Sequence, residues 1–396
     1  QRRGRAGRCQ PGVAFTLYSK KRYDAFARFT PPEILETPLE ELCLQIKLLT
    51  EKFVAVVEEE VPESMRTFLS WTSATSVEDF LGRALDQPSQ RSINNAMQLL
   101  HSIGALTDDV RITALGRFLA RLPLDPRLGK MLFVSCFFGC LEPMLTVAAA
   151  ASNRSPFNIP SAAVVGSRAK GQLLLTQAKK RLAGGTSSDH IALVQLYARW
   201  REMSGDNRGR RRFLSDHFAS EGSLRQIDRS RRDLMKHLRE MGFANGPHYN
   251  SNAHRTSILL AVISAGLYPN VAVVKPGRQT LSCRDAQTVN MHISSLNHKS
   301  KVGSAQSTWF VFQEALKGSS FAIHLQMTSP TNPYALLLVC FDYTARTAAA
   351  ANQSKDKPSE TKAAVADVDV EEDEMEAPVD AFDITQINDW ISFHVP

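Results

Sequence analysis

The first eight residues, QRRGRAGR, contain the side chains with the most specific chemistry in this sequence. If they form one or two helical turns, Gln1, Arg5 and Arg8 lie at offsets of 0, 4 and 7 and share one face. Each guanidinium can bind phosphate oxygens bidentately and keeps its charge at any working pH. On such a face these residues would form a clamp for the terminal phosphate of a nucleotide, which would stabilise a transferred phosphoryl group. Composition alone, however, favours a basic arm or RGG-like tail that binds nucleic acid, because such arms are common.

The distribution of charge also favours a polyanionic partner. The formal net charge is +7, but nine of the 40 acidic residues lie between Asp367 and Asp383, where there are no basic residues. The rest of the chain thus carries 47 basic and 31 acidic residues, a net charge of +16. Such a charge is typical of nucleic-acid-binding proteins, because lysine and arginine gain free energy when they displace counterions from phosphates.

The six cysteines show neither a metal-ligand pattern nor a disulfide framework. They form no CxxC pair, and Cys136 and Cys140 are four residues apart, which is a helical stacking distance. We therefore expect no metal site. The thiols are expected to be reduced and mostly buried, as in an intracellular protein. Cytoplasm or nucleus is the favoured compartment, with the mitochondrion as the alternative. No apolar run is long enough to cross a bilayer, so we expect no membrane partner.

Residues 1–32 are predicted to be the end of an α/β domain. The segment VAFTLY, residues 13–18, follows the turn signal Pro11-Gly12 and is rich in β-branched and aromatic residues. This composition predicts a strand. The Pro31-Pro32 pair then interrupts the chain, so the strand is expected to be the last one of a larger domain.

Residues 33–123 predict a winged helix. Thr37 can cap a helix that has Pro38 at its first position, with Glu40 closing a capping box. The apolar residues of this helix share one face, which must be covered: Leu39, Leu42, Cys43, Ile46 and Leu49. The later segments complete a winged-helix order, with helices over 77–85 and 89–103, a polar hairpin at ALTDDVRIT and a helix over 113–121.

A helical period continues over 124–245 and predicts a bundle. Its segment SNRSPF, residues 152–157, is a polar loop, and its arginine-rich segment 199–212 is expected to contain an exposed basic loop. Phosphate binding and simple solvation explain this basic loop equally well: Arg208, Arg210 and Arg211 are its candidate RNA ligands. Six later basic residues are expected to spread around their helix and to be mostly solvated, with one stripe of them as a further candidate RNA contact: Arg225, Arg229, Arg231, Arg232, Lys236 and Arg239.

Over 254–345 the pattern changes to strands and predicts a small five-stranded barrel of the oligonucleotide-binding (OB) type, with a sandwich as the alternative. A helix over 258–265 precedes the expected strands, which are NVAVV, TVNMHI, TWFVF, FAIHL and ALLLVCF. Residues 346–381 are rich in alanine, lysine and then acidic residues, and predict a disordered linker. Residues 382–396 are expected to start a further element.

The opening octet resembles motif VI of the superfamily 2 helicases, and its context is similar to the DEAH/RHA group of ATP-dependent RNA helicases. The similar segments are, in chain order, PGVAFTLYSKKRYD, PPEILETPLEELCLQIKLL, LLHSIGALTDD, ITALGRFLARLPLDPRLGKML, AAAASNRSPF, SDHIALVQLYARW, AGLYPNVAVV and HISSLN. They cover roughly residues 1–345. The resemblance implies a multidomain, mostly α fold: the end of a second RecA-like domain, a winged helix, a ratchet-like bundle and an OB-type barrel.

The resemblance also implies ATP as cofactor, with Mg²⁺ held by motifs outside this chain, and single-stranded RNA as partner, gripped mainly by its backbone. Arg5 and Arg8 would be arginine fingers that face the γ-phosphate together with Gln1. A bundle loop and a barrel strand end would contact RNA through Asn153, Arg154, Ser155, His292, Ser294 and Ser295. Ile293 stands where the family commonly has proline, so this turn is expected to be less rigid. A protein activator or ribonucleoprotein is a further implied partner.

Two motifs that such an ATPase needs do not occur in the sequence, a GxxxxGK[ST] phosphate loop and a DEAH box. This polypeptide by itself is therefore expected not to hydrolyse ATP. We expect it to be the carboxy-terminal part of a longer helicase, which the initial Gln favours. The alternatives are a motor-less RNA-binding or scaffold protein and an unrelated winged-helix DNA-binding protein.

Two Asp-His pairs have residue types found in catalytic sites, Asp189-His190 and Asp216-His217. No nucleophilic serine or cysteine with suitable spacing accompanies them, so helix capping by Asp189 and packing of His190 explain the first pair better. Three aromatic side chains could stack on bases, but aromatic residues at periodic positions usually pack in a core: Trp200, Trp309 and Phe310.

Overall fold

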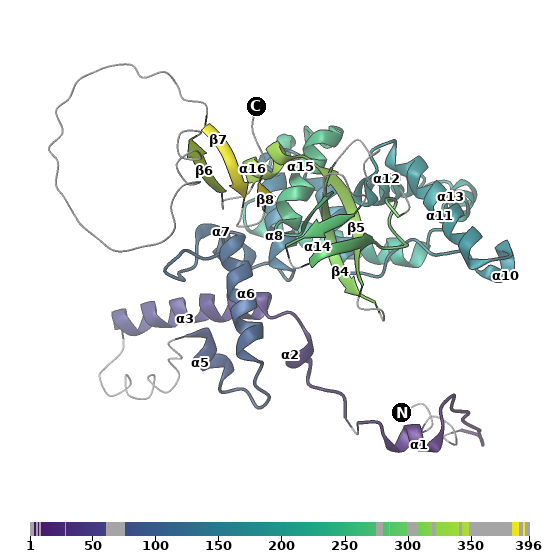
Figure 1. The fold of residues 1–396 in the computed structure, drawn as a ribbon, viewed down its shortest axis with the longest axis horizontal. Coiled ribbons are helices and arrows are strands. Elements are labelled where there is room, and N and C mark those ends of the chain that lie inside the picture. Colours follow the sequence, from purple (N-terminus) through teal and green to yellow (C-terminus); the bar gives the residue numbers. More distant parts are fainter. Residues whose placement is uncertain are drawn as a thin grey trace, which may run out of the picture.

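The computed structural model describes residues 4, 7, 9–27, 29–60, 76–274, 280–284, 286–298, 308–318, 322–339, 343–347, 382–387 and 391–392. Gln1, Arg5 and Arg8 lie outside these described residues, as does almost all of the linker predicted at 346–381. Figure 1 shows the helices α3, α5, α6 and α7 as one group and the later helices packed around the barrel strands as another.

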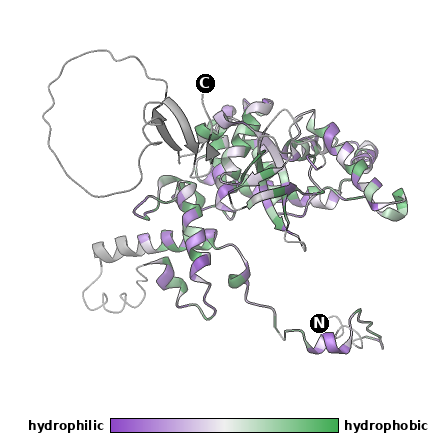
Figure 2. Ribbon diagram, viewed as in Figure 1, coloured by the Kyte–Doolittle hydropathy of each residue, from purple (hydrophilic) through white to green (hydrophobic). Residues whose placement is uncertain are grey.

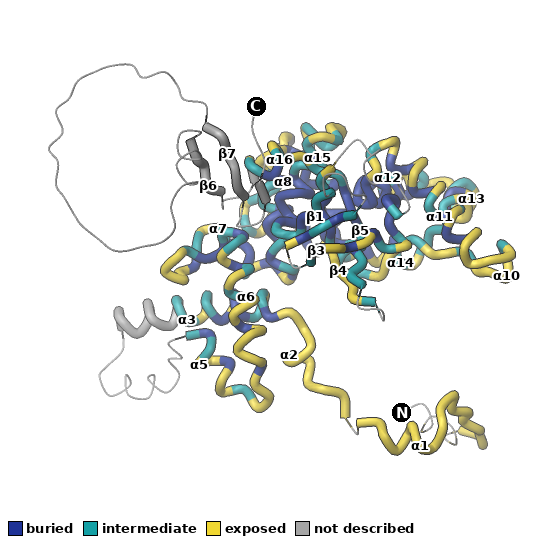
Figure 3. Tube along the Cα trace, viewed as in Figure 1, coloured by how far each residue is buried: buried dark blue, intermediate teal, exposed yellow. Residues whose placement is uncertain are grey.

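The segment before the winged helix contains two short helices, α1 (Lys20–Asp24) and α2 (Glu33–Glu36). The strand predicted at 13–18 is wrong, because these residues form no strand in the described structure. A strand needs partners for its backbone groups, and no described strand pairs with this segment. Figure 3 shows this part of the chain as exposed, including three apolar side chains: Val13, Phe15 and Leu17.

The winged helix is built from α3 (Glu40–Glu60), α5 (Val77–Leu81), α6 (Gln90–Ser102) and α7 (Ala114–Leu119). Helix α3 packs against the other three. The helix start expected at Thr37 is wrong, because the Thr37 hydroxyl donates to the Glu33 carbonyl (2.8 Å) and ends α2 instead. The inward face of α3 is mostly as predicted, except that Leu49 is exposed.

The predicted hairpin forms a minimal wing, in which Leu106 and Ile112 make a single β-bridge. The Ile112 amide donates to the Glu51 carboxylate of α3 (2.8 Å), so the wing is fixed to that helix. Gly116 lies against the wing backbone, and a Cβ at this position would come within 2.2 Å of the Ala105 oxygen. Only glycine therefore allows α7 to pack this closely.

The bundle contains α8 (Pro126–Phe137), α9 (Leu141–Ala151), α10 (Ala162–Val165), α11 (Arg168–Ala183), α12 (Asp189–Glu202), α13 (Asn207–Asp216) and α14 (Glu221–Glu240). Several of its helices begin at a side chain that accepts a backbone N–H: Asp125, Ser167, Ser188, Asp206 and Ser220. Figure 2 shows hydrophobic and hydrophilic residues on the same helices, as expected of helices with one packed face.

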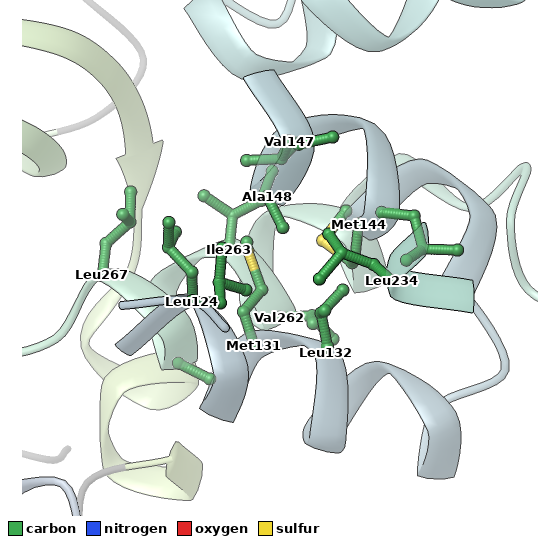
Figure 4. Close-up of a cluster of buried hydrophobic side chains, with 14 of the residues drawn as sticks. Leu124, Met131, Leu132, Met144, Val147, Ala148, Leu234, Val262, Ile263 and Leu267 are labelled. Atoms are coloured by element: carbon green, nitrogen blue, oxygen red, sulfur yellow. The ribbon is translucent and has the colours of Figure 1, made fainter. Parts of the chain in front are cut away.

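Helix α15 (Thr256–Leu267) connects the bundle to the barrel and packs on α8. Figure 4 shows Val262, Ile263 and Leu267 of α15 beside Met131 and other buried side chains of the bundle. The two helices approach so closely that a Cβ on Gly266 would lie 2.2 Å from the Met131 Cβ. A short 3-10 helix, η2 (Pro247–Asn250), precedes α15.

The barrel closes in the strand order β1-β2-β3-β5-β4, from β1 (Val271–Val274), β2 (Leu281–Cys283), β3 (Ala286–Met291), β4 (Trp309–Lys317) and β5 (Ile323–Thr331). Neighbouring strands are antiparallel except β3 and β5, which are parallel. Its interior holds a separate small apolar cluster that includes Phe310, Phe312 and Leu325. The five-stranded barrel is thus confirmed.

One of its expected strands is wrong. ALLLVCF was predicted as a strand, but α16 (Pro333–Val339) covers most of it, and the short β2 takes its place as the fifth strand. The Asn332 side chain accepts the Ala335 N–H (2.7 Å), and Pro333 occupies the first turn, so the local sequence specifies a helix start. Downstream, β6 (Tyr343–Thr347), β7 (Phe382–Ile387) and β8 (Ile391–Ser392) form a separate antiparallel sheet.

Candidate nucleic-acid interface

A basic surface lies along α14. Five exposed cations recur every three or four residues and therefore share one face of the helix, which we call the cationic stripe: Arg225, Arg229, Arg232, Lys236 and Arg239. At a rise of 1.5 Å per residue, the stripe extends over about 21 Å. Three of the cations pair with acids of the same helix at 2.9 to 3.8 Å. Such exposed pairs contribute little free energy, so the stripe remains available to phosphates.

The expectation that these six basic residues spread around the helix is wrong, because five of them share the stripe and only Arg231 turns into the bundle. The expectation that most of them are solvated is confirmed, since the five stripe residues are exposed. The Arg231 guanidinium carbon lies 4.3 Å from the centroid of the Tyr197 ring, and its Nη2 donates to the Glu142 carboxylate. Arg231 lines a groove of about 390 Å³ between α9, α12 and α14. The groove holds both charge signs, because Asp228 accepts hydrogen bonds there from Tyr197 and Arg201, each at 2.6 Å.

The carboxyl and phenol in this groove have shifted pKa values. Burial alone would raise the pKa of Asp228, but hydrogen bonds from Tyr197 and Arg201 bring it below its ordinary value. Burial, followed by the hydrogen bond to Asp228, raises the pKa of Tyr197. Asp228 therefore stays ionised and pairs both with Arg201 and with the stripe residue Arg232.

The polar loop after α9 presents only part of the predicted set. Asn153 is half-buried, and its amide donates to the Ala149 carbonyl (2.7 Å) and the Ser230 hydroxyl (2.9 Å). It thereby ends α9 and fixes the loop to α14. Ser155 is exposed and accepts the Phe157 N–H (3.3 Å). Arg154 is exposed, so its guanidinium is accessible to solvent.

The basic loop expected around 208–212 is wrong, because these residues belong to α13. Asp206 caps this helix by accepting the Gly209 N–H (2.8 Å), and Phe213 and Leu214 bury its apolar side. Arg208 and Arg211 are exposed. Arg210 is instead held by Glu221 (3.3 Å) and Asn207 (2.8 Å), with its side chain 18% exposed.

The barrel residues predicted to contact RNA lie in the turn after β3. His292 is half-buried, and its Nδ1 lies 2.8 Å from the Ser294 hydroxyl. Burial, and then the charges of His324 and His298, lower the pKa of His292, so its ring is neutral at neutral pH. Ser295 is buried and donates to Asp189 (2.7 Å), so it cannot contact RNA in this arrangement.

Sequence reasoning did not predict that five polar residues are buried together and join barrel and bundle. We call them the junction cluster: Lys179, Asp189, Ser295, Asn297 and Thr328. The cap of α12 is Ser188, which accepts the Ile191 N–H (3.1 Å), and not Asp189 as expected. Asp189 instead pairs with Lys179 at 3.2 Å, with exposures of 0% and 5%. The sequence indicated only an acidic residue at a helix start, which capping already explained.

The three candidate aromatic residues differ. Trp200 and Phe310 are buried, as expected of core residues. Trp309 is half-buried and lines a cavity of about 530 Å³ between α15, the ends of β4 and β5, and the loop at 186–187.

Burial raises the pKa of two thiols, Cys43 and Cys140, to about 12.

Within the described ranges, no three His, Cys, Asp or Glu side chains gather closely enough to hold a metal ion. In the same part of the chain, no helix has both the length and the apolar character needed to cross a bilayer.

Three domain families match the chain in order. Residues 96–124 match the helicase associated domain (HA2), winged-helix, and residues 125–193 match the helicase associated domain (HA2), ratchet-like. Residues 259–343 match the oligonucleotide/oligosaccharide-binding (OB)-fold. These matches fall on the wing, the first half of the bundle and the barrel.

Similar curated proteins include the Arabidopsis thaliana DExH-box ATP-dependent RNA helicase DExH1, which is 36% identical over 344 residues. The Mus musculus ATP-dependent RNA helicase DHX29 and the Homo sapiens ATP-dependent DNA/RNA helicase DHX36 are each 32% identical, over 356 and 350 residues. Each alignment covers 85% of this chain but only 31%, 23% and 31% of the three relatives. The chain thus spans about a quarter to a third of the proteins that it resembles.

Proposed function

Because this chain belongs to the DEAH/DExH-box RNA helicases, whose carboxy-terminal helicase-associated region it represents, we propose that it grips single-stranded RNA for an ATP-driven motor. The full protein would couple nucleoside triphosphate hydrolysis to RNA translocation, unwinding or ribonucleoprotein remodelling. The observation that carries the proposal is the cationic stripe on α14. The same helix is bonded through Ser230 to the loop that contains the exposed Arg154.

The spacing of the stripe suits a single strand. Successive cations are about 4.5 or 6 Å apart along the helix, which is comparable to the reach between adjacent phosphates of an extended strand. Guanidinium and ammonium groups on one exposed face bind the backbone without reading bases. The grip should therefore be sensitive to salt and tolerant of sequence.

The nucleotide side of the proposal concerns residues outside the described structure. Arg5 and Arg8 would be arginine fingers, with Gln1 beside them, for an ATP molecule held by a domain that contains the phosphate loop and the magnesium box. Arginine fingers raise phosphoryl-transfer rates by about 10³ to 10⁵. ATP would draw the motor domains together, and hydrolysis would release them while the bundle and the barrel hold RNA.

The test is RNA-stimulated ATP hydrolysis by a protein that joins this chain to such a domain. Arg5→Ala or Arg8→Ala should lower kcat by about 10³ or more, whereas Arg22→Ala, an exposed arginine on α1, should leave it unchanged. Equal kcat values for Arg5→Ala, Arg8→Ala and the parent would contradict the arginine-finger assignment.

The cationic stripe would serve equally well in a second candidate, a motor-less RNA-binding or scaffold protein derived from such a helicase. That alternative predicts the same salt-sensitive RNA binding, without RNA-stimulated ATP hydrolysis by any native form of the protein. Both candidates fail if this chain does not bind RNA.

A further inference from the structure

The junction cluster is a buried polar contact that joins the bundle to the barrel. It lies where α12 meets β5 and the turn that follows β3. Asp189 at its centre is inaccessible to water, and the Lys179 ammonium beside it is almost so. Groups of this kind are tolerated in an interior only when their hydrogen bonds are satisfied.

Both oxygens of Asp189 are saturated by donors. Oδ1 accepts the Leu296 N–H (3.1 Å) and the Lys179 ammonium (3.2 Å). Oδ2 accepts the Ser295 hydroxyl (2.7 Å) and the Thr328 N–H (3.1 Å). Each oxygen thus faces a backbone N–H that can only donate. An asparagine would have to turn its NH₂ toward one of them, so only a carboxylate satisfies this site.

The bundle also holds the other side of the same turn. Lys179 donates to the Ser294 carbonyl (2.7 Å), and Gln172, also on α11, donates to the Ile293 carbonyl. The Asn297 amide, within the turn itself, reaches back to the Ser187 carbonyl (2.9 Å) before α12. The turn is therefore hydrogen-bonded to two side chains of α11 and to the backbone just before α12.

A buried ion pair gives little stability beyond that of apolar packing of the same volume, because desolvation offsets the attraction. What this pair contributes is the position of the turn, because its hydrogen bonds are directional and hold specific backbone and side-chain groups of the turn. The turn in question carries His292 and Ser294, which lie on its less buried side. Without the junction cluster, the turn would depend on Ile293 at the position where proline would have stiffened it.

We propose that Asp189 is a positioning residue, which fixes the turn 292–297 to the bundle and so sets the direction in which His292 and Ser294 meet RNA. The proposal rests on the RNA-gripping function proposed above. It assigns no contact with RNA to Asp189 itself. Its effect reaches the nucleic acid through its hydrogen bonds to Leu296 and Ser295 and through Lys179, which holds the Ser294 carbonyl.

Asp189→Asn in the full chain separates this proposal from simple electrostatics. Removing a negative charge from a basic protein should tighten RNA binding by Coulomb attraction alone. If Asp189 positions the turn, affinity for a single-stranded RNA oligonucleotide should instead fall by about tenfold, since a buried N–H loses its acceptor. Asp206→Asn, an exposed helix-start carboxylate near basic side chains, is the matched control and should leave affinity unchanged or slightly raised.

A second readout does not depend on RNA. Amide hydrogen exchange at Leu296 and Thr328, whose N–H groups donate to Asp189, should accelerate in Asp189→Asn, and the ring NMR signals of His292 should shift. Amides in the core of α9 should keep their parent rates. Parent exchange rates at Leu296 and Thr328, together with unchanged or tighter RNA binding, would overturn the proposal.

The two proposals can fail separately. If the parent chain does not bind RNA, the gripping function is contradicted, while the exchange rates still decide whether Asp189 holds the turn. If exchange accelerates but RNA affinity keeps its parent value, the turn does not orient RNA and the positioning role is wrong. Should Asp189→Asn fail to fold, Ser295→Ala removes one bond to Oδ2 and is expected to weaken RNA binding by about threefold; parent affinity in that folded variant would count against the proposal.

Discussion

The junction cluster and the cationic stripe both concentrate charge, but in opposite environments. Asp189 and Lys179 are buried away from water, and each oxygen of the carboxylate has at least two donors. The stripe residues of α14 are exposed, and among the described residues three of them pair with acids of their own helix. Buried charge is costly to break and fixes geometry, whereas exposed charge contributes little to stability and is free to bind. The comparison therefore predicts stability effects at the junction and binding effects on the stripe.

The largest expected effect is on stability at the junction. Asp189→Ala should lower the free energy of unfolding by about 3–5 kcal/mol, because it leaves the buried Lys179 ammonium without its ionic partner and two backbone N–H groups without their acceptor. Urea denaturation would measure it. Asp216→Ala, at a carboxylate that is 60% exposed, is the control and should change it by less than about 0.5 kcal/mol. Equal losses in the two variants would remove the distinction between the regions.

The second effect is a pH dependence of stability, and it comes from His190, which follows Asp189 at the junction. Burial lowers the pKa of His190 from 6.5 to about 4, so the unfolded chain takes up this proton first as pH falls. The contribution of neutral His190 to the free energy of unfolding is complete above pH 6.5. It is lost progressively as pH falls towards 4, by about 3 kcal/mol in total. The difference in unfolding free energy between the parent and His190→Asn should therefore shrink over this window. A difference that stays constant from pH 7 to 4 would contradict a neutral, buried His190.

The third effect moves to the stripe and to binding. Arg229→Ala combined with Arg239→Ala should reduce the slope of log K for single-stranded RNA against log salt by about 1.4, since each lost phosphate contact removes about 0.7. Fluorescence anisotropy between 50 and 200 mM salt would show it, with the free energy of unfolding nearly unchanged. A slope equal to that of the parent would mean that Arg229 and Arg239 make no contact with RNA phosphates.

The smallest effect compares two neighbours on α13. Arg211 is exposed, whereas Arg210 is held by Glu221 and Asn207. Arg211→Ala should lower the salt slope by about 0.7, while Arg210→Ala should leave the slope unchanged and cost at most about 1 kcal/mol of stability. The reverse result would place the internally paired arginine, and not the exposed one, on the RNA path.

Local rules predicted the helical part of the fold well. Helix starts with a serine or threonine cap were read correctly at Ser89 and Thr113, because the capping bond lies within four residues of chain. The same local reasoning was wrong at Thr37, where the preceding short helix uses the hydroxyl. It was also wrong for ALLLVCF, whose apolar run fits a strand or a helix until the Asn332-Pro333 start is considered.

The candidate site was predictable only where one helix contains it. The stripe of α14 follows from its spacing of three and four residues, and needed only the helix bounds to become visible. The junction cluster was not predictable, because the bonds from Asp189 to the barrel join residues more than 100 positions apart, such as Asp189 and Leu296. Burial also reverses the expectation at Ser295, which resembled an RNA contact and is instead bonded inside the molecule.

The most direct test of the central claim is the affinity of this chain for single-stranded RNA as salt rises from 50 to 200 mM, measured with two oligonucleotides of unrelated sequence. A grip through backbone phosphates predicts a linear fall of log K with log salt and nearly equal affinities for the two sequences. Affinity that does not change with salt, or that differs by more than about tenfold between the sequences, would contradict it.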